Sequence, residues 1–271
     1  MNANCPFCSS MDLDFKTTIT KKPERETDFK IPTHEYTRSI YQCNSCQVNI
    51  ADHSYDFEEL YRGSYNSSTY KNRITRAYQR IINLPEGESD NHLRCMRVHK
   101  KLGALQFKPG ATRILDIGSG LCVFLKKMQD LGYPGFAIDP DPISAQHALE
   151  TVGLQGAFCG NLQDFDLAER FQAISLNKVL EHVKDPLLML QQSLEHLEVG
   201  GLFYIELPDG CRAEAYGGLV DREEFYIEHY YAFSKKSMKA LMEAAALTDI
   251  HIESMYEPSG KYSLFGFGIK A

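Results

Sequence analysis

Two pairs of cysteines near the N-terminus could hold a metal ion. Cys5 and Cys8, like Cys43 and Cys46, are separated by two residues, so each pair can place two thiolates about one tight turn apart. Four thiolates complete the tetrahedral coordination of zinc and leave no open position for water. The pattern therefore predicts a structural Zn²⁺ site, and a redox-active dithiol is the alternative interpretation.

A second candidate site is an acidic and glycine-rich stretch in the middle of the chain. Asp116 precedes Gly118, Ser119 and Gly120, and Asp139 ends the next apolar run. Glycines let the backbone approach a ligand closely, and the start of a following helix offers N–H donors. Asp139 either accepts hydrogen bonds from ribose hydroxyls or caps the helix that follows it. Asp116 would repel the pyrophosphate of a dinucleotide, but it can bind the ammonium end of an amino-acid-bearing cofactor.

Two histidines could act as a general base. His182 follows an apolar run of the C-terminal half, and His229 lies in the segment Glu228–Ser234 (EHYYAFS). A histidine of near-neutral pKa can take a proton from a hydroxyl group or from a carbon next to a carbonyl. We expect Glu228 to orient His229, and the alternative for His182 is local packing at the start of a helix.

The elements that must position these groups alternate between apolar strands and helices. Strands are predicted at residues 113–117, 136–139 and 171–176, and a helix is predicted from residue 123, directly after the glycines. Ligands of open α/β sheets bind beyond the carboxyl ends of the strands, where we expect the acids and both histidines.

The N-terminal third is predicted to form two smaller units. Residues 1–54 are expected to be a zinc-ribbon-like module and residues 55–108 a helical linker or cap, which leaves residues 109–271 as the catalytic domain. A hairpin around residues 13–20 and 35–42 would return the chain from one cysteine pair to the other.

Two helices are predicted in the linker. They span Tyr70–Ile81 and about Asn91–Leu105. On the first helix, Arg73, Arg76 and Arg80 share one face, which we interpret as solvated; a site for a substrate diphosphate is the alternative.

The order of five segments resembles that of the class I S-adenosylmethionine (SAM)-dependent methyltransferases. The segments are ILDIGSG, FAID, GNLQDF, SLNKVLEHVKDP and GGLFYIELPD, and they span residues 113–209. The resemblance implies an α/β fold with a Rossmann-like seven-stranded sheet, mostly parallel, whose antiparallel last strand lies within residues 264–269 and pairs with residues 250–255. One departure is Cys122, which stands where the family loop usually has its third glycine.

The same resemblance implies a role for each cofactor-binding position. Asp116, Gly118, Ser119 and Gly120 would lie at the methionine end of SAM, and Asp139 at the ribose. Asn161 and Leu162 would lie beside the adenine, and Asn177 below the sulfonium.

A more specific resemblance concerns the methyl acceptor. The cysteine pairs ahead of the core and the segment EHYYAFS are similar to those of the nucleotide-sugar C-methyltransferases of deoxysugar pathways. Members of that family carry a further C-terminal domain beyond the point where this sequence stops. The resemblance therefore implies methyl transfer to an oxygen or carbon of a small molecule, such as a sugar or nucleotide-linked sugar, more than C-methylation itself.

Charge and composition restrict the partners. The net charge is −7, and the excess of acidic residues falls in residues 111–271, which argues against binding a nucleic acid. A methyltransferase for RNA or protein and a non-catalytic SAM-binding protein remain alternatives. No long apolar run and no leader-like start are present in the sequence, so we expect no membrane span and a cytoplasmic location.

Overall fold

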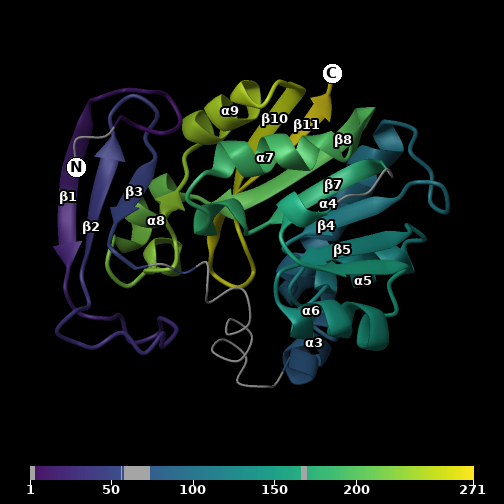
Figure 1. Cartoon of the computed structure of the whole chain (residues 1–271), viewed down its shortest axis with the longest axis horizontal. Coiled ribbons are helices and arrows are strands. Elements are labelled where there is room, and N and C mark those ends of the chain that lie inside the picture. Colours follow the sequence, from purple (N-terminus) through teal and green to yellow (C-terminus); the bar gives the residue numbers. More distant parts are fainter. Residues whose placement is uncertain (1–3, 56, 58–73, 166–169) are drawn as a thin grey trace.

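The computed structural model describes residues 4–55, 57, 74–165 and 170–271, which form two sheets (Figure 1). The larger sheet has seven strands in the order β10-β11-β8-β7-β4-β5-β6. Its strands are β4 (Ile114–Ile117), β5 (Gly135–Asp139), β6 (Gly156–Cys159), β7 (Phe171–Asn177), β8 (Leu197–Pro208), β10 (Leu247–Tyr256) and β11 (Tyr262–Lys270).

The direction of the strands confirms the predicted mixed sheet. Strands β4 to β8 pair in parallel, whereas β11 runs antiparallel to both of its neighbours, β8 and β10. Residues Ile114–Ile117 are buried throughout, because a central parallel strand is covered on both faces. This arrangement fits the Rossmann-like fold that the sequence predicted.

Helices cover both faces of the larger sheet and bury two apolar clusters. One cluster contains residues of α3, α4 and α5, and the other contains residues of α7 and α9. The helices are α3 (Ile74–Ile82), α4 (Asp90–Ala104), α5 (Val123–Asp130), α6 (Pro142–His147), α7 (Pro186–Glu195), α8 (Gly210–Gly217) and α9 (Lys235–Ala244). Short turns of helix are η1 (Glu86–Glu88), η2 (Ala148–Val152), η3 (Leu162–Asp164), η4 (Leu180–His182) and η5 (Glu223–Phe225).

The two linker helices are observed, with one boundary outside the described residues. Helix α4 matches the helix predicted near Asn91, and the Ser89 hydroxyl caps it by accepting from the backbone N–H of His92 at 3.1 Å. Helix α3 is described from Ile74 onward, so the predicted start at Tyr70 and Arg73 lies outside the description. Arg76 and Arg80 are exposed, in agreement with a solvated face.

The smaller sheet is antiparallel and combines three strands of the N-terminal part of the chain with one strand of the C-terminal half. It has the order β1-β2-β3-β9, with β1 (Leu13–Ile19), β2 (Arg38–Cys43), β3 (Asn49–Asp52) and β9 (Tyr231–Ala232). The β1–β2 pair is the predicted hairpin. The fourth strand, β9, follows His229 almost directly, so the N-terminal module shares its sheet with a segment of the C-terminal half (Figure 1).

Side chains reinforce this junction between the module and the C-terminal half. The Phe7 ring packs edge-on against Tyr231 and Phe233, with ring centroids 5.0 and 5.2 Å apart. The Ser234 hydroxyl donates to the backbone carbonyl of Cys46. The cysteine-bearing turns therefore pack directly on the strand that follows His229.

A buried ion pair forms a second junction. Arg38 and Glu26 have fully buried side chains, and Arg38 Nη1 lies 2.6 Å from Glu26 Oε1. The same carboxylate oxygen accepts a hydrogen bond of 2.7 Å from the backbone N–H of Ile227. Separating such a pair would leave a charge buried without compensation, which costs about 3–5 kcal/mol.

A third buried charge anchors α4 to the carboxyl end of β8. Glu206 accepts hydrogen bonds from Arg94, Arg97 and the Tyr204 hydroxyl, the last at 2.7 Å. Burial by itself would raise the pKa of Glu206, but Arg94, Lys178 and the Tyr204 hydroxyl together outweigh burial and lower that pKa to about 2. Glu206 is therefore a buried anion that stabilises the fold, because Arg94 and Arg97 of the same chain are its positively charged partners.

Replacing Phe7 with alanine should loosen the junction between the two sheets. Because its ring contacts two aromatic side chains of the C-terminal half, we expect the free energy of unfolding to fall by about 2 kcal/mol in chemical denaturation. Phe15→Ala is the matched control, since Phe15 is 58% exposed and pairs with Tyr41 of the same hairpin. Equal losses in the two variants would contradict the role given to Phe7.

Candidate functional site

The loop after β4 has a backbone that only small residues tolerate. Gly118 has a φ of +70°, and a Cβ added to it would lie 2.7 Å from Val179 Cγ2. Gly120 also has a positive φ, +49°, and its N–H donates to Asp139 Oδ2 at 2.7 Å. The buried Ser119 lies between them. The loop therefore depends on these glycines for its conformation at the carboxyl ends of β4 and β5.

Cys122 occupies the position that departs from the family pattern. It lies directly before α5 with a left-handed φ of +54°, a conformation that costs a non-glycine residue about 1–2 kcal/mol. Its side chain is fully buried, with Sγ 3.8 Å from the carbonyl oxygen of Gly120. The cysteine therefore fits the loop, which keeps its turn without the third glycine.

Asp116 and Asn177 are joined by the two central strands. The Asp116 carboxylate accepts hydrogen bonds from Ser175 Oγ at 2.5 Å and from Asn177 Nδ2 at 2.8 Å. Burial raises the pKa of Asp116 to about 7. Among the described residues, no lysine or arginine forms an ion pair with this carboxylate, in contrast to Glu206.

Asp139 does not cap a helix. Its carboxylate accepts from the backbone N–H groups of Gly120 and Asp141, and burial raises its pKa to about 6. The cap of α6 is Asp141, whose Oδ1 accepts from the Ile143 N–H at 2.8 Å. The alternative interpretation of Asp139 as the helix cap is therefore wrong.

The other predicted cofactor residues lie at the same edge of the sheet. Asn161 and Leu162 follow β6, where Leu162 is buried and begins the short helix η3. The eight residues assigned to the cofactor thus follow, or end, the adjacent strands β4, β5, β6 and β7. This edge is where an open α/β sheet binds its ligands.

His182 and His229 come together from segments far apart in the sequence. Their ring centroids lie 4.6 Å apart. Nδ1 of His182 donates to the carbonyl oxygen of Glu228 at 3.0 Å, and Nδ1 of His229 donates to that of Glu224 at 3.1 Å. These bonds assign the Nδ1–H form to both neutral rings and leave Nε2 as the proton-accepting nitrogen of each.

Burial keeps both imidazoles uncharged. It lowers the pKa of His182 to about 4 and the pKa of His229 well below its ordinary value, where the neighbouring His182 adds to the effect. Both rings are therefore in the proton-accepting form at neutral pH.

The segment that carries His229 is held from two sides. The carbonyl of Tyr230 accepts from the Ala51 N–H at 2.9 Å, and the N–H of Tyr230 donates to the carbonyl of Glu181 at 2.8 Å. Glu228 meets the pair through its backbone carbonyl, which orients His182. Its carboxyl group is buried, which raises its pKa to about 8. We expected Glu228 to orient His229, but the backbone carbonyl of Glu224 holds that ring instead.

Glu181 is a residue that the sequence analysis did not select. One carboxylate oxygen of Glu181 and one ring nitrogen each of His182 and His229 lie within 4.8 Å of one another. Burial raises the pKa of Glu181 to about 7. The cluster can exchange protons, and its donors could also hold a divalent cation. In the sequence, its position next to His182 was the feature that could have pointed to Glu181. The contact with His229 joins residues far apart in the chain, so the sequence did not indicate it.

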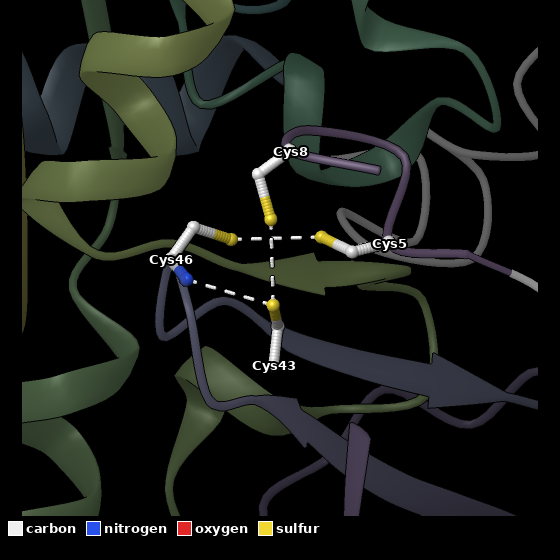
Figure 2. A group of neighbouring side chains, drawn as sticks. All are labelled: Cys5, Cys8, Cys43 and Cys46. Carbon is white, nitrogen blue, oxygen red and sulfur yellow. Dashed lines mark hydrogen bonds between the residues drawn. The ribbon is translucent and has the colours of Figure 1, made fainter. Parts of the chain in front are cut away.

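The four N-terminal cysteines converge as predicted. Their Sγ atoms all lie within 4.8 Å of one another, with Cys5 opposite Cys46 and Cys8 opposite Cys43 at 3.5 Å each (Figure 2). Zinc–sulfur bonds of about 2.3 Å in a tetrahedron require sulfur atoms slightly under 4 Å apart. The donor set and its spacing therefore fit a closed Zn²⁺ site.

Among the described residues, no helix is long and apolar enough to cross a membrane.

Known proteins similar to this chain are methyltransferases. Residues 87–252 match the family model of a methyltransferase domain. A ubiquinone biosynthesis O-methyltransferase of Xanthomonas campestris pv. campestris is 29% identical over 166 residues, which are 55% of this chain and 68% of that protein.

Two solved structures share the fold and were determined with the product form of the cofactor. The 1,6-didemethyltoxoflavin-N1-methyltransferase of Burkholderia thailandensis has a TM-score of 0.60 at 18% identity, covering 84% of this chain and 96% of that chain. Magnesium protoporphyrin IX methyltransferase from Synechocystis PCC 6803 has a TM-score of 0.56 at 14% identity, covering 74% and 97%. Both contain S-adenosylhomocysteine, and the first also contains 1,6-didemethyltoxoflavin.

The sequence match and the strand order agree on one assignment. The family model covers more than half of the chain, including the glycine loop, Asp139 and the His182–His229 pair. The chain therefore belongs to the methyltransferase domain family and is a class I SAM-dependent methyltransferase.

Proposed function

We propose that this enzyme methylates an oxygen or carbon of a small molecule that lies against His182 and His229. The observation that carries the proposal is the approach of these two neutral imidazoles at the edge of the sheet where the glycine loop lies. The names of the relatives support a small acceptor, since one acts in ubiquinone biosynthesis and another methylates a toxoflavin precursor.

We assign the cofactor-binding roles by the family pattern and the local chemistry. Asp116 takes the ammonium group of SAM, and the backbone of Gly118, Ser119 and Gly120 lies beside its methionine portion. Asp139 accepts from the ribose hydroxyls. Asn161 and Leu162 flank the adenine, and Asn177 lies below the sulfonium, where its hydrogen bond to Asp116 orients it. The buried carboxylates support this assignment, because SAM supplies an ammonium group for Asp116 and neutral hydroxyl donors for Asp139.

His229 is the proposed base, with His182 beside it. SAM supplies a methyl group on a positively charged sulfur, and the acceptor's oxygen or carbon bonds to that methyl carbon as the sulfur–methyl bond breaks. The acceptor loses a proton, which Nε2 of His229 accepts. Glu181 can stabilise the imidazolium that forms, since its carboxylate lies in the same cluster. The contact of Nδ1 with the Glu224 carbonyl holds the ring in the required tautomer.

A sugar or nucleotide-linked sugar is the finer proposal for the acceptor. Its support is the segment EHYYAFS together with the cysteine module, which resemble the nucleotide-sugar C-methyltransferases. A sugar hydroxyl, or a carbon next to a carbonyl, has the acidity that a histidine base can serve.

We also propose that Cys5, Cys8, Cys43 and Cys46 bind one structural Zn²⁺ in a zinc-ribbon-like module. When bound, the ion crosslinks the two cysteine-bearing turns, and no protein-free coordination position is left for chemistry. The module is small, so such a crosslink would contribute a large part of its stability.

The ribose assignment predicts a specific loss of cofactor affinity. Asp139→Ala should weaken SAM binding at least about tenfold in isothermal calorimetry, because charge-assisted hydrogen bonds contribute about 1.5–3 kcal/mol. Asp130→Ala removes the same charge from an exposed position at the end of α5 and should leave the affinity unchanged. Unaltered binding by the Asp139 variant, in a protein that melts normally, would remove the assignment.

The base assignment predicts loss of turnover without loss of cofactor. His229→Ala should reduce transfer of labelled methyl to an accepted substrate by about 10²–10⁴-fold while SAM affinity is retained. Candidate acceptors are screened first with wild-type protein, using nucleotide sugars and phenols. His251→Ala is the control, since His251 lies exposed on β10. Retained turnover in His229→Ala would make His229 a structural residue.

The metal proposal predicts about one zinc per chain in elemental analysis of the purified protein. Cys43→Ser should abolish that zinc and lower the melting temperature, because Cys43 is fully buried within the cluster. Cys159→Ser, at an exposed cysteine outside the cluster, should change neither quantity. A metal-free wild type with the stability of the Cys43 variant would refute the site.

A further inference from the structure

Three tyrosines form an exposed aromatic cluster at the carboxyl edge of the larger sheet. Tyr216 lies near the end of α8, and Tyr256 and Tyr262 flank the turn between β10 and β11. The Tyr216 and Tyr262 rings stack at 5.6 Å with an interplanar angle of 21°, and the Tyr256 ring lies 4.9 Å from that of Tyr262. We refer to these three residues as the tyrosine platform. It is reached from solvent, since Tyr216 is 71% and Tyr256 62% exposed.

The central ring of the platform, Tyr262, and the turn before it are held by Arg222. The Arg222 guanidinium lies 4.9 Å from the centroid of the Tyr262 ring, and its Nη2 donates to the carbonyl of Gly260 at 3.2 Å in the β10–β11 turn. Arg222 is itself fixed by two hydrogen bonds to Glu224, at 3.0 and 2.5 Å. Stacked rings that are held in place lose little conformational entropy when they bind a flat ligand.

One residue connects the platform to the candidate active site. The buried carboxylate of Glu224 accepts a hydrogen bond of 2.8 Å from the backbone N–H of Tyr262. The backbone carbonyl of Glu224 accepts a hydrogen bond of 3.1 Å from Nδ1 of His229. The proposed base and the start of β11 are therefore attached to the same residue. Figure 1 shows α8, which carries Tyr216, between the smaller sheet and the larger one. Glu224 thus links the start of β11, and with it Tyr262, to the ring of His229.

Two cations beside the platform, Arg222 and Lys261, are paired with acidic side chains. Arg222 is bound by Glu224, and Lys261 lies 2.9 Å from Glu223. A ligand would therefore gain little from a charge at this place and more from a planar ring that covers the exposed tyrosines. Stacking of one ring on an aromatic side chain contributes about 1–3 kcal/mol.

We propose that the tyrosine platform binds a planar aromatic or heteroaromatic ring carried by the methyl acceptor, while the reacting atom lies at the His182–His229 pair. This inference rests on the proposed function, because it names the chemical class of the acceptor for the same site. A nucleobase and a phenolic ring share the required chemistry.

Binding of simple ring compounds tests the proposal without knowledge of the acceptor. Ligand-observed NMR would measure the affinity of uridine 5′-monophosphate and of 4-hydroxybenzoate in the presence of S-adenosylhomocysteine, with ribose 5-phosphate as a ringless control. We expect at least one ring compound to bind and ribose 5-phosphate not to bind. Preference for the nucleotide would identify a nucleobase as the natural ring, and preference for the benzoate a phenol.

Variants of the platform decide whether the ring binds there. Combined Tyr216→Ala and Tyr256→Ala should weaken ring binding about tenfold, a loss in the range of one stacking contact. The corresponding double phenylalanine variant should restore binding, since stacking does not need the hydroxyl groups. Tyr41→Ala, in the Phe15–Tyr41 pair of the N-terminal module, is the matched control.

Two outcomes would overturn the proposal: absence of ring binding in the wild type, or equal binding in the double alanine variant. Failure of the proposed function would look different, because S-adenosylhomocysteine would then fail to bind, or His229→Ala would retain turnover. Ring binding and S-adenosylhomocysteine binding are measured separately, which separates the two tests.

Discussion

The pairing of β9 with β3 is the constraint on which the arrangement of the candidate active site depends. Tyr230 precedes β9, and its two backbone groups are bonded to Ala51 of the module and to Glu181 of the catalytic core. His229 is adjacent, so its ring is brought to within 4.6 Å of His182. The N-terminal module therefore helps to position the segment that carries His229. A separate recognition unit would not need to share a sheet with this segment.

Buried carboxylates take two different states in this protein. Glu206 has arginine partners, which keep its pKa low although burial favours the neutral form. Asp116 and Asp139 have backbone, hydroxyl or amide partners, and burial raises both pKa values. The first arrangement stabilises the fold in the absence of a ligand. The second arrangement leaves carboxylates at the edge of the sheet without an ion-pair partner among the described residues. A cation can bind there, and this is the physical basis of the proposed cofactor position.

The similarity to known methyltransferases is uneven along the chain. The family match spans residues 87–252 and so includes the glycine loop and both histidines. The cysteine cluster, Tyr256 and Tyr262 lie outside it. The glycine loop and both histidines thus fall within the matched region, whereas the cysteine cluster and two of the three platform tyrosines fall outside it.

The sequence by itself determined the groups whose partners are close along the chain or follow a periodic pattern: the cysteine pairs, the glycine loop, the alternating strands and helices, and Asp139 at a strand end. The common edge at which these groups meet followed because parallel strands bring their carboxyl ends together, and the mixed seven-stranded sheet came from the family resemblance. Only the tertiary structure decided the entry of β9 into the smaller sheet, the Glu181–His182–His229 cluster and the use of the Glu228 carbonyl in place of its carboxyl group. Those contacts join segments distant in sequence, and they depend on packing and backbone hydrogen bonds that residue type and spacing do not encode.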